Sequence, residues 1–269
     1  IDQEISNNSS LIGRDLISDD LVYLTDKDAN LHTFCIGTTG SGKTTGISNI
    51  IESCINRDIP LFYVDGKGDT SLAKRIEQYC IEIEKPFYLF SMVGDSVKYN
   101  PIYTGGITSK KDRIVELREW SEDHYRKIAE GYLQTVFKVL ERAKEKTDLF
   151  TLAKYMEQEN LYLIARKLKD KNLISEIDSL SNKRKNIESL ISEVENIANS
   201  EIGHLFDCSE GNVLTLSKAL KEKAVVYFSL QPLAFPSYAN TLGKLIINYI
   251  KALAASQLTN NTPSTIYTI

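Results

Sequence analysis

Short apolar runs alternate with amphipathic stretches along the first ninety residues. The stretches at 45–55 and 71–84 repeat apolar side chains at helical spacing, so they predict two helices. The runs between and around them are short and β-prone, and they predict strands at 21–24, 32–36, 60–64 and 86–90. Strand, helix, strand, helix, strand is the order typical of a parallel α/β sheet.

The pattern changes in the middle of the chain and then returns. From 110 to 223 the periodicity is helical, Lys and Glu are frequent, and strand signals are few. Residues 224–230 are again a short apolar run, followed by a helical stripe over 237–257 and the start of another strand at 264–269. We therefore predict a first α/β part at 1–109, an inserted all-α subdomain at 110–223, and a return to the α/β part at 224–269.

One motif in the first α/β part indicates which ligand it binds. Residues 37–44 read Gly-Thr-Thr-Gly-Ser-Gly-Lys-Thr, a complete match to the phosphate-binding pattern G-x-x-x-x-G-K-[ST] between a predicted strand and a predicted helix. We expect Lys43 to reach the β- and γ-phosphates of ATP and the Thr44 hydroxyl to bind Mg²⁺, so both are the candidate catalytic residues. The predicted nucleotide-binding residues are Gly37, Thr38, Thr39, Gly40, Ser41, Gly42, Lys43, Thr44 and Thr45. The predicted fold is a RecA-like P-loop NTPase sheet with an inserted all-α subdomain.

A P-loop ATPase also needs a carboxylate at the end of an apolar strand to hold Mg²⁺. Asp65 follows such a strand, but it belongs to a separate Asp-Gly-Lys-Gly-Asp loop at 65–69. The alternative, which we favour, is an acidic pair directly after Ile269. On that interpretation the chain as given binds nucleotide and hydrolyses it poorly.

Composition narrows the class of protein. The net charge of −4 argues against a chain coated in nucleic acid, although local basic patches can still bind it. Three of the four cysteines fall within apolar patterns, which predicts reduced core thiols rather than a zinc or redox site. The three histidines are far apart, so a histidine metal site is not expected. No apolar run is long enough to cross a membrane.

Two further features have two interpretations each. Gln231 ends the apolar run at 224–230, so it could sense the γ-phosphate or line a pore, or it could be a turn residue before Pro232. The basic clusters of the helical region could contact phosphates, but acidic neighbours make a solvated helix face the better interpretation. These clusters contain Arg166, Lys167, Lys169 and Lys171, and then Lys183, Arg184 and Lys185.

Several motifs together resemble the coupling-protein ATPases of conjugation and type IV secretion, within the FtsK/HerA superfamily of DNA-pumping motors. They are Gly13-Arg14-Asp15, the phosphate loop, Asp65-Gly66-Lys67-Gly68-Asp69, Tyr99-Asn100-Pro101, the helical insertion, and the strand and long helix after residue 223. The resemblance covers nearly the whole chain. The phosphate loop is specific for nucleotide alone, and the other motifs with the insertion carry the family resemblance.

The resemblance implies a motor that couples ATP hydrolysis to the movement of DNA, with a relaxase or another secreted protein as cargo. It implies a homo-hexamer at the cytoplasmic face of the bacterial inner membrane, anchored by a segment outside this soluble chain. An alternative function is a nucleotide-dependent platform that recruits protein cargo and pumps no DNA. A metabolic P-loop kinase is disfavoured by the large helical insertion.

Overall fold

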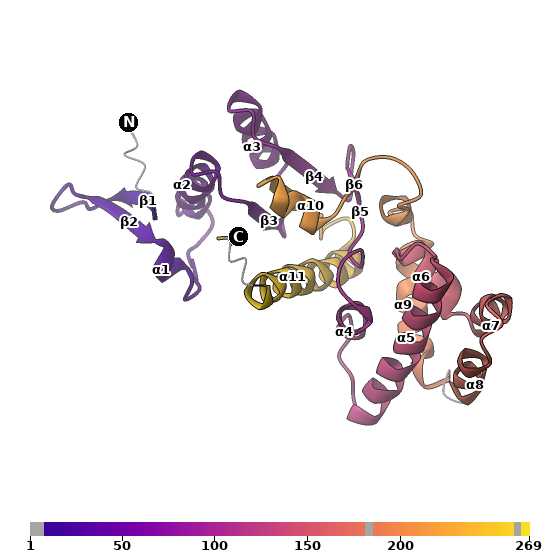
Figure 1. Ribbon diagram of the computed structural model, residues 1–269. Coiled ribbons are helices and arrows are strands. Elements are labelled where there is room, and N and C mark those ends of the chain that lie inside the picture. Colours follow the sequence, from indigo (N-terminus) through magenta and orange to yellow (C-terminus); the bar gives the residue numbers. More distant parts are fainter. Residues whose placement is uncertain (1–7, 181–184, 261–264) are drawn as a thin grey trace.

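A four-stranded parallel sheet forms the centre of the protein (Figure 1). The computed structural model describes residues 8–180, 185–260 and 265–269. The sheet has the order β4–β7–β3–β8, and every pairing in it is parallel. Its strands are β3 (Leu61–Asp65), β4 (Phe87–Ser91), β7 (Val225–Ser229) and β8 (Tyr267–Thr268). The parallel sheet with its many helices confirms the predicted α/β class and is consistent with a RecA-like fold.

The inner strand β7 shows why the sheet forms here. All five of its residues are buried. Val225 and Tyr227 pack into one apolar cluster, whereas Val226 and Phe228 pack into another. A strand covered on both faces is apolar at successive positions rather than at alternate ones, which explains the continuous apolar run in the sequence.

Two helices cover the first face of the sheet, and both confirm the predicted periodicity. They are α2 (Lys43–Asn56) and α3 (Thr70–Glu82). Cys54 and Cys80 lie fully buried in this layer, and burial raises the pKa of their thiols to about 12 and about 11. These two cysteines therefore behave as small core residues, as the sequence predicted.

The second face packs against α11 (Pro236–Thr259), whose buried stripe includes Leu242, Leu245, Ile246 and Tyr249. The same apolar cluster continues into the helices that precede β7. These helices are α4 (Ile107–Val115), α5 (Asp123–Ala143), α6 (Leu149–Met156), α7 (Gln158–Lys167), α8 (Lys171–Leu180), α9 (Glu188–Ala198), a 3₁₀ helix (Gly203–Phe206) and α10 (Leu216–Lys221). Because this core is continuous from sheet to helices, the division into a separate subdomain stays a prediction.

The helical region carries one small departure from the predicted all-α content. The two-residue strand β6 (Val213–Leu214) pairs in parallel with β5 (Lys98–Tyr99). This pairing ties the end of the helical region to the segment that follows β4. Lys183 and Arg184 of the predicted basic cluster lie outside the described residues. None of the described helices combines the length and the apolar character needed to cross a membrane.

An antiparallel hairpin precedes the phosphate loop. It consists of β1 (Ser9–Arg14) and β2 (Leu21–Thr25), with the short helix α1 (Asp26–Ala29) after it, and β1 packs against α2. The Arg57 guanidinium forms an ion pair with Asp26 at 2.9 Å, and the Tyr267 hydroxyl donates to the same carboxylate. These contacts join α1, which follows the hairpin, to the end of α2 and to strand β8.

The predicted strand at 32–36 is wrong. These residues have no regular structure, and Phe34 and Ile36 are 88% and 75% exposed. His32 takes a left-handed φ of 67°, which ends any extended backbone at that position. A strand also needs a neighbouring strand to pair with. The strand at this edge of the sheet, β8, is itself paired with β3 through only two residues. Cys35 is consequently exposed rather than part of the core.

Candidate nucleotide-binding site

The phosphate loop ends at the N-terminus of α2, as the motif predicts. Gly42 is the N-cap of this helix and Gly40 lies two residues before it, and both take left-handed φ angles of 84° and 83°. Only glycine adopts these angles at low cost. No side chain caps the helix, so the N–H groups of its first turn are available to a phosphate.

Lys43 holds the loop in its present shape. Its Nζ donates hydrogen bonds to the carbonyl oxygens of Gly37 at 2.5 Å and Thr38 at 2.7 Å. At Gly37 a Cβ would lie 2.4 Å from the Ser41 Oγ, so the loop closes around a position without a side chain. A bound phosphate would replace these carbonyls with a stronger, charged partner for the ammonium group.

The loop is open to solvent. Residues 37–42 are exposed, as are Thr44 and Thr45 in the first turn of α2. The Thr44 carbonyl accepts a hydrogen bond from the Ser48 Oγ at 2.8 Å, which fixes this turn. Positive-φ glycines, uncapped amides, a lysine and a hydroxyl are the groups that a nucleotide phosphate with Mg²⁺ needs, so the residues present fit that ligand.

The Asp65 carboxylate has a different environment. Asp65 is 6% exposed at the end of β3, and its Oδ1 accepts from the Lys67 N–H at 2.7 Å. Its Oδ2 accepts from the Asp69 N–H at 2.5 Å and from the Tyr227 hydroxyl at 2.7 Å. Three hydrogen bonds therefore already use both oxygens. This arrangement favours the alternative in which another carboxylate holds Mg²⁺, and a metal role for Asp65 stays a hypothesis.

The remainder of this loop is equally ordered. The Asp69 carboxylate caps α3 by accepting from the N–H groups of Ser71 and Leu72 at 3.0 and 3.1 Å. Gly68 has a φ of 74°, and a Cβ there would lie 2.3 Å from the side chain of Gln231. The loop is thus held from the β3 side, from the α3 side and from the end of β7.

Gln231 and Tyr227 make the contacts from β7. Gln231 takes a left-handed φ of 44°, and its Nε2 donates to the Gly68 carbonyl at 3.2 Å and to the Ser229 Oγ at 3.1 Å. The structure thus places Gln231 at a turn that supports the Asp65 loop. The sequence prediction missed Tyr227, whose pKa is raised by burial and by its hydrogen bond to Asp65. The available signal was a hydroxyl-bearing ring inside a buried apolar run, two residues before the strand ends.

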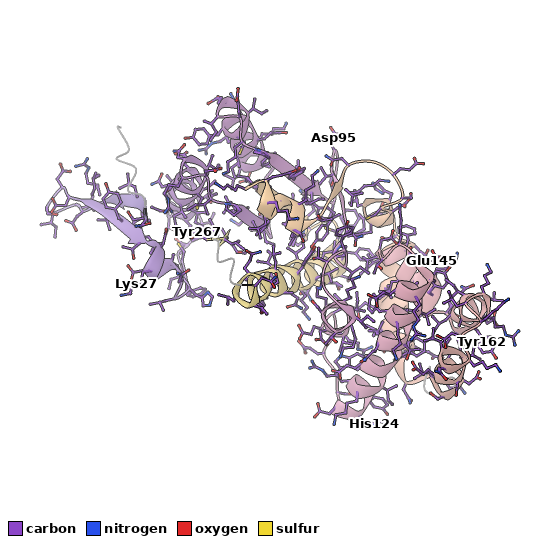
Figure 2. The ribbon with its side chains drawn as sticks, in the orientation of Figure 1. Lys27, Asp95, His124, Glu145, Tyr162 and Tyr267 are labelled. Atoms are coloured by element: carbon purple, nitrogen blue, oxygen red, sulfur yellow. The ribbon has the colours of Figure 1, made fainter. Side chains whose placement is uncertain are left out.

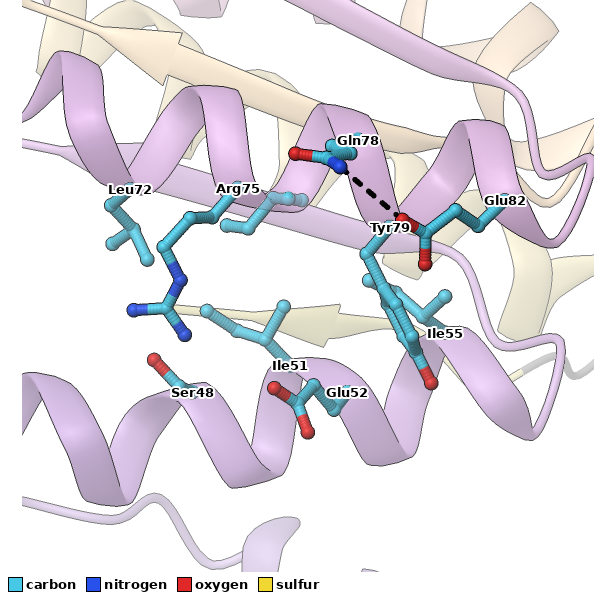
Figure 3. A pocket seen from close by; sticks show the side chains of 10 residues that line it. Ser48, Ile51, Glu52, Ile55, Leu72, Arg75, Gln78, Tyr79 and Glu82 are labelled. Carbon is cyan, nitrogen blue, oxygen red and sulfur yellow. Dashed lines mark hydrogen bonds between the residues drawn. The ribbon is translucent and has the colours of Figure 1, made fainter.

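A cavity of about 200 Å³ lies between α2 and α3 (Figure 3). Its floor is apolar, and Glu52 and Arg75 approach it from the two helices. It begins at Ser48, beyond the first turn of α2, so the phosphate loop does not line it.

The described residues contain no group of three or more His, Cys, Asp or Glu side chains that could hold a metal ion. Figure 2 shows His124, at the start of α5, well separated from Tyr267 of strand β8.

Each comparison with known proteins covers about a third of the chain or less. Residues 11–93 match the family described as helicase HerA-like C-terminal. Over 72 residues the chain is 29% identical to the type 4 coupling protein DotL of Legionella pneumophila, which covers 27% of this chain and 9% of DotL. Over 79 residues it is 28% identical to an uncharacterized protein of Mycoplasma pneumoniae, covering 29% of this chain and 63% of that protein.

The matched family region contains both the phosphate loop and the Asp65 loop. The chain covers less than two thirds of either relative's length. These similarities support a place among the FtsK/HerA-type motor ATPases, a group that uses nucleotide and Mg²⁺. The family match ends at residue 93, before the helices that follow β5.

Proposed function

We propose that this chain is the ATP-binding motor domain of a coupling protein in conjugation or type IV secretion. The observation that carries the proposal is the complete phosphate loop at the uncapped N-terminus of α2, with Gly40 and Gly42 in left-handed conformations. The match to a HerA-like helicase domain and the similarity to a type 4 coupling protein support it. The substrate would be DNA with an attached relaxase or another secreted protein.

The chain's own residues would bind and orient the nucleotide. Backbone N–H groups of the loop and of the first turn of α2 would surround the phosphates, and Lys43 would move from two carbonyl oxygens to the β- and γ-phosphates. The Thr44 hydroxyl would bind Mg²⁺, which neutralises phosphate charge when present. By resemblance we propose a homo-hexamer at the cytoplasmic face of the inner membrane.

Nucleotide binding is tested by the variant Lys43→Ala. It removes a charge-assisted phosphate contact of roughly 1.5–3 kcal/mol, so ATP affinity measured by calorimetry should fall about 10- to 150-fold. Lys74→Ala, at an exposed position of α3, is the matched control and should keep the affinity of the parent chain. Equal affinities for all three proteins would refute the assignment of the phosphate loop.

Motor activity is tested with the full-length protein. Steady-state ATP turnover that rises when DNA is added would support translocation. ATP-dependent capture of a protein cargo, with no response of turnover to DNA, would instead support the recruiting platform.

A further inference from the structure

Another cavity, of about 380 Å³, lies between the end of α11 and the start of α4. These two helices pack against each other (Figure 1). Because α11 starts after the end of β7 and ends before β8 begins, its last turns lie at the edge of the sheet where the strands start. The phosphate loop lies at the opposite edge, since it is at the N-terminus of α2 and α2 ends just before β3 starts. The cavity is therefore separate from the candidate nucleotide-binding site.

Arg113 brings a buried positive charge to this cavity. The residue is 3% exposed, and among the described residues no ion pair within 4.0 Å involves it. None of the described residues that line the cavity is acidic. Burial lowers the pKa of the guanidinium, which reflects the cost of keeping this cation away from water. A buried charge is costly unless it is paired, so an anion in the cavity would remove a cost that the protein itself leaves in place.

The contacts of Arg113 are all with neutral groups. Its Nε donates to the Ser109 carbonyl at 3.2 Å, and its Nη1 donates to the Pro101 carbonyl at 2.7 Å. Its Nη2 donates to the Thr104 carbonyl and, at 3.4 Å, to the Ser109 Oγ. The guanidinium also lies over the Tyr249 ring, 4.5 Å from the ring centroid. These contacts fix the plane of the guanidinium at the cavity wall without supplying a negative charge.

The other polar groups of the cavity can donate hydrogen bonds to an anion. Six of the residues that line it carry a hydroxyl: Thr104, Ser109, Ser217, Tyr249, Ser256 and Thr259. Gly105 and Gly106 line the same end, and Gly106 is the N-cap of α4 without any side-chain hydrogen bond. The N–H groups of the first turn of α4 therefore have no capping partner from a side chain. Hydroxyls, helix N-terminal amides and an arginine are together the donors that bind phosphate oxygens in proteins.

The size and the remaining wall of the cavity suit more than a bare ion. Sites for small organic molecules have volumes of about 300–1,000 Å³, and this cavity falls at the lower end of that range. Ala252 and Leu253 of α11 form an apolar part of the wall. There is consequently room for a short carbon chain beside an anionic group.

We propose that this cavity binds a small organic phosphate, with the phosphate group against Arg113 and the first turn of α4 and the carbon part against Ala252 and Leu253. The site shares no residue with the candidate nucleotide-binding site, so the inference goes beyond the proposed function and does not depend on it. A planar guanidinium with several hydroxyls offers donors in more than one direction, which suits the three oxygens of a phosphate group.

The test is calorimetry of glycerol 3-phosphate binding to the Lys43→Ala chain, in which the phosphate loop lacks its cation. We expect binding of glycerol 3-phosphate, weaker binding of inorganic phosphate and no binding of glycerol. A chain that does not bind glycerol 3-phosphate, or that binds glycerol equally well, would overturn the proposal. Equal affinities for glycerol 3-phosphate and inorganic phosphate would overturn the part that concerns the carbon chain.

Ala255→Glu tests the location of the site. Ala255 lines the cavity at an exposed position of α11, so a longer side chain there does not disturb the core. Its carboxylate would compete for the cation and repel the ligand, so the affinity for glycerol 3-phosphate should fall at least about 10-fold. Ala254→Glu, at the next exposed position of the same helix and outside the cavity lining, is the matched control and should keep the affinity. Equal affinities of the two variants would overturn the proposal.

Arg113→Lys tests the cation itself. Lysine keeps the charge but lacks the planar set of donors, so the affinity should fall about 10- to 150-fold. Thermal unfolding shows whether this variant folds. If it does not, Ser109→Ala takes its place, and the loss of one hydroxyl should weaken binding about 2- to 13-fold. An affinity that is unchanged in the folded variant would overturn the proposal.

ATP binding separates this site from the phosphate loop. The Ala255→Glu chain should bind ATP as the parent chain does, because the two sites lie at opposite edges of the sheet. Glycerol 3-phosphate binding that is lost in Lys43→Ala and kept in Ala255→Glu would assign the ligand to the phosphate loop and overturn the proposal. A loss of ATP binding in Lys43→Ala with intact glycerol 3-phosphate binding would support two independent sites.

Discussion

Asp65→Asn distinguishes the two roles open to the carboxylate at the end of β3. In the structure its Oδ2 accepts from the Asp69 N–H and from the Tyr227 hydroxyl, and its Oδ1 accepts from the Lys67 N–H. Asparagine keeps one oxygen acceptor and replaces the other with an NH₂ donor. That donor would face either the Lys67 N–H or the Asp69 N–H, so one hydrogen bond is lost whichever way the amide turns.

The expected cost follows from these contacts. Hydrogen bonds to charged groups contribute about 1.5–3 kcal/mol and neutral ones about 0.5–1.5 kcal/mol. One charged bond disappears, one becomes neutral, and the Tyr227 hydroxyl can rotate to accept instead of donate. Because Asp69 is exposed, water can partly satisfy its freed N–H. We expect a total loss of about 2–4 kcal/mol in the free energy of unfolding, which lowers Tm by roughly 4–16 °C in a chain of this size.

The assay combines thermal unfolding with calorimetry of ATP binding in the presence and absence of Mg²⁺. A structural role predicts a lower Tm and an unchanged ratio of the two affinities. Tyr227→Phe is the control for the same network, and it should cost about 1.5 kcal/mol because it removes one bond to the carboxylate. An Asp65→Asn variant with the parent Tm and no Mg²⁺ dependence would refute this reasoning and make Asp65 the metal ligand.

Two further predictions concern pH and the phosphate loop. Burial raises the pKa of Tyr63 and of Tyr267 from 10.0 to about 12, so the unfolded chain loses these protons first as pH rises. The contribution of these two tyrosines to the free energy of unfolding, measured with urea, should therefore be fully present below about pH 10 and decline between about pH 10 and pH 12. A free energy of unfolding that does not change over that range would contradict the prediction. Gly42→Ala should cost about 1–2 kcal/mol because of its left-handed φ, whereas Gly46→Ala, in open space within α2, should stabilise the protein by about 0.5–1 kcal/mol, both measured by thermal unfolding.

The local parts of the fold and of the site could be predicted from the sequence alone. The helices α2, α3 and α11 follow from apolar side chains at helical spacing, which neighbouring residues determine. The same holds for the phosphate loop, because left-handed glycines and the first turn of a helix lie within eight consecutive positions. Strand β7 was equally predictable, since burial on both faces requires an unbroken apolar run.

Only the tertiary structure decided the features that depend on distant partners. Residues 32–36 have a strand-like composition, but a strand forms through hydrogen bonds to a neighbouring edge, and that neighbour is not encoded in the run itself. The role of Asp65 depends on Tyr227, 162 positions later. Lys144 and Lys221 likewise line one cavity although they are far apart in the sequence. Periodicity reports which side of an element is buried, whereas contacts between elements depend on how the chain folds back on itself.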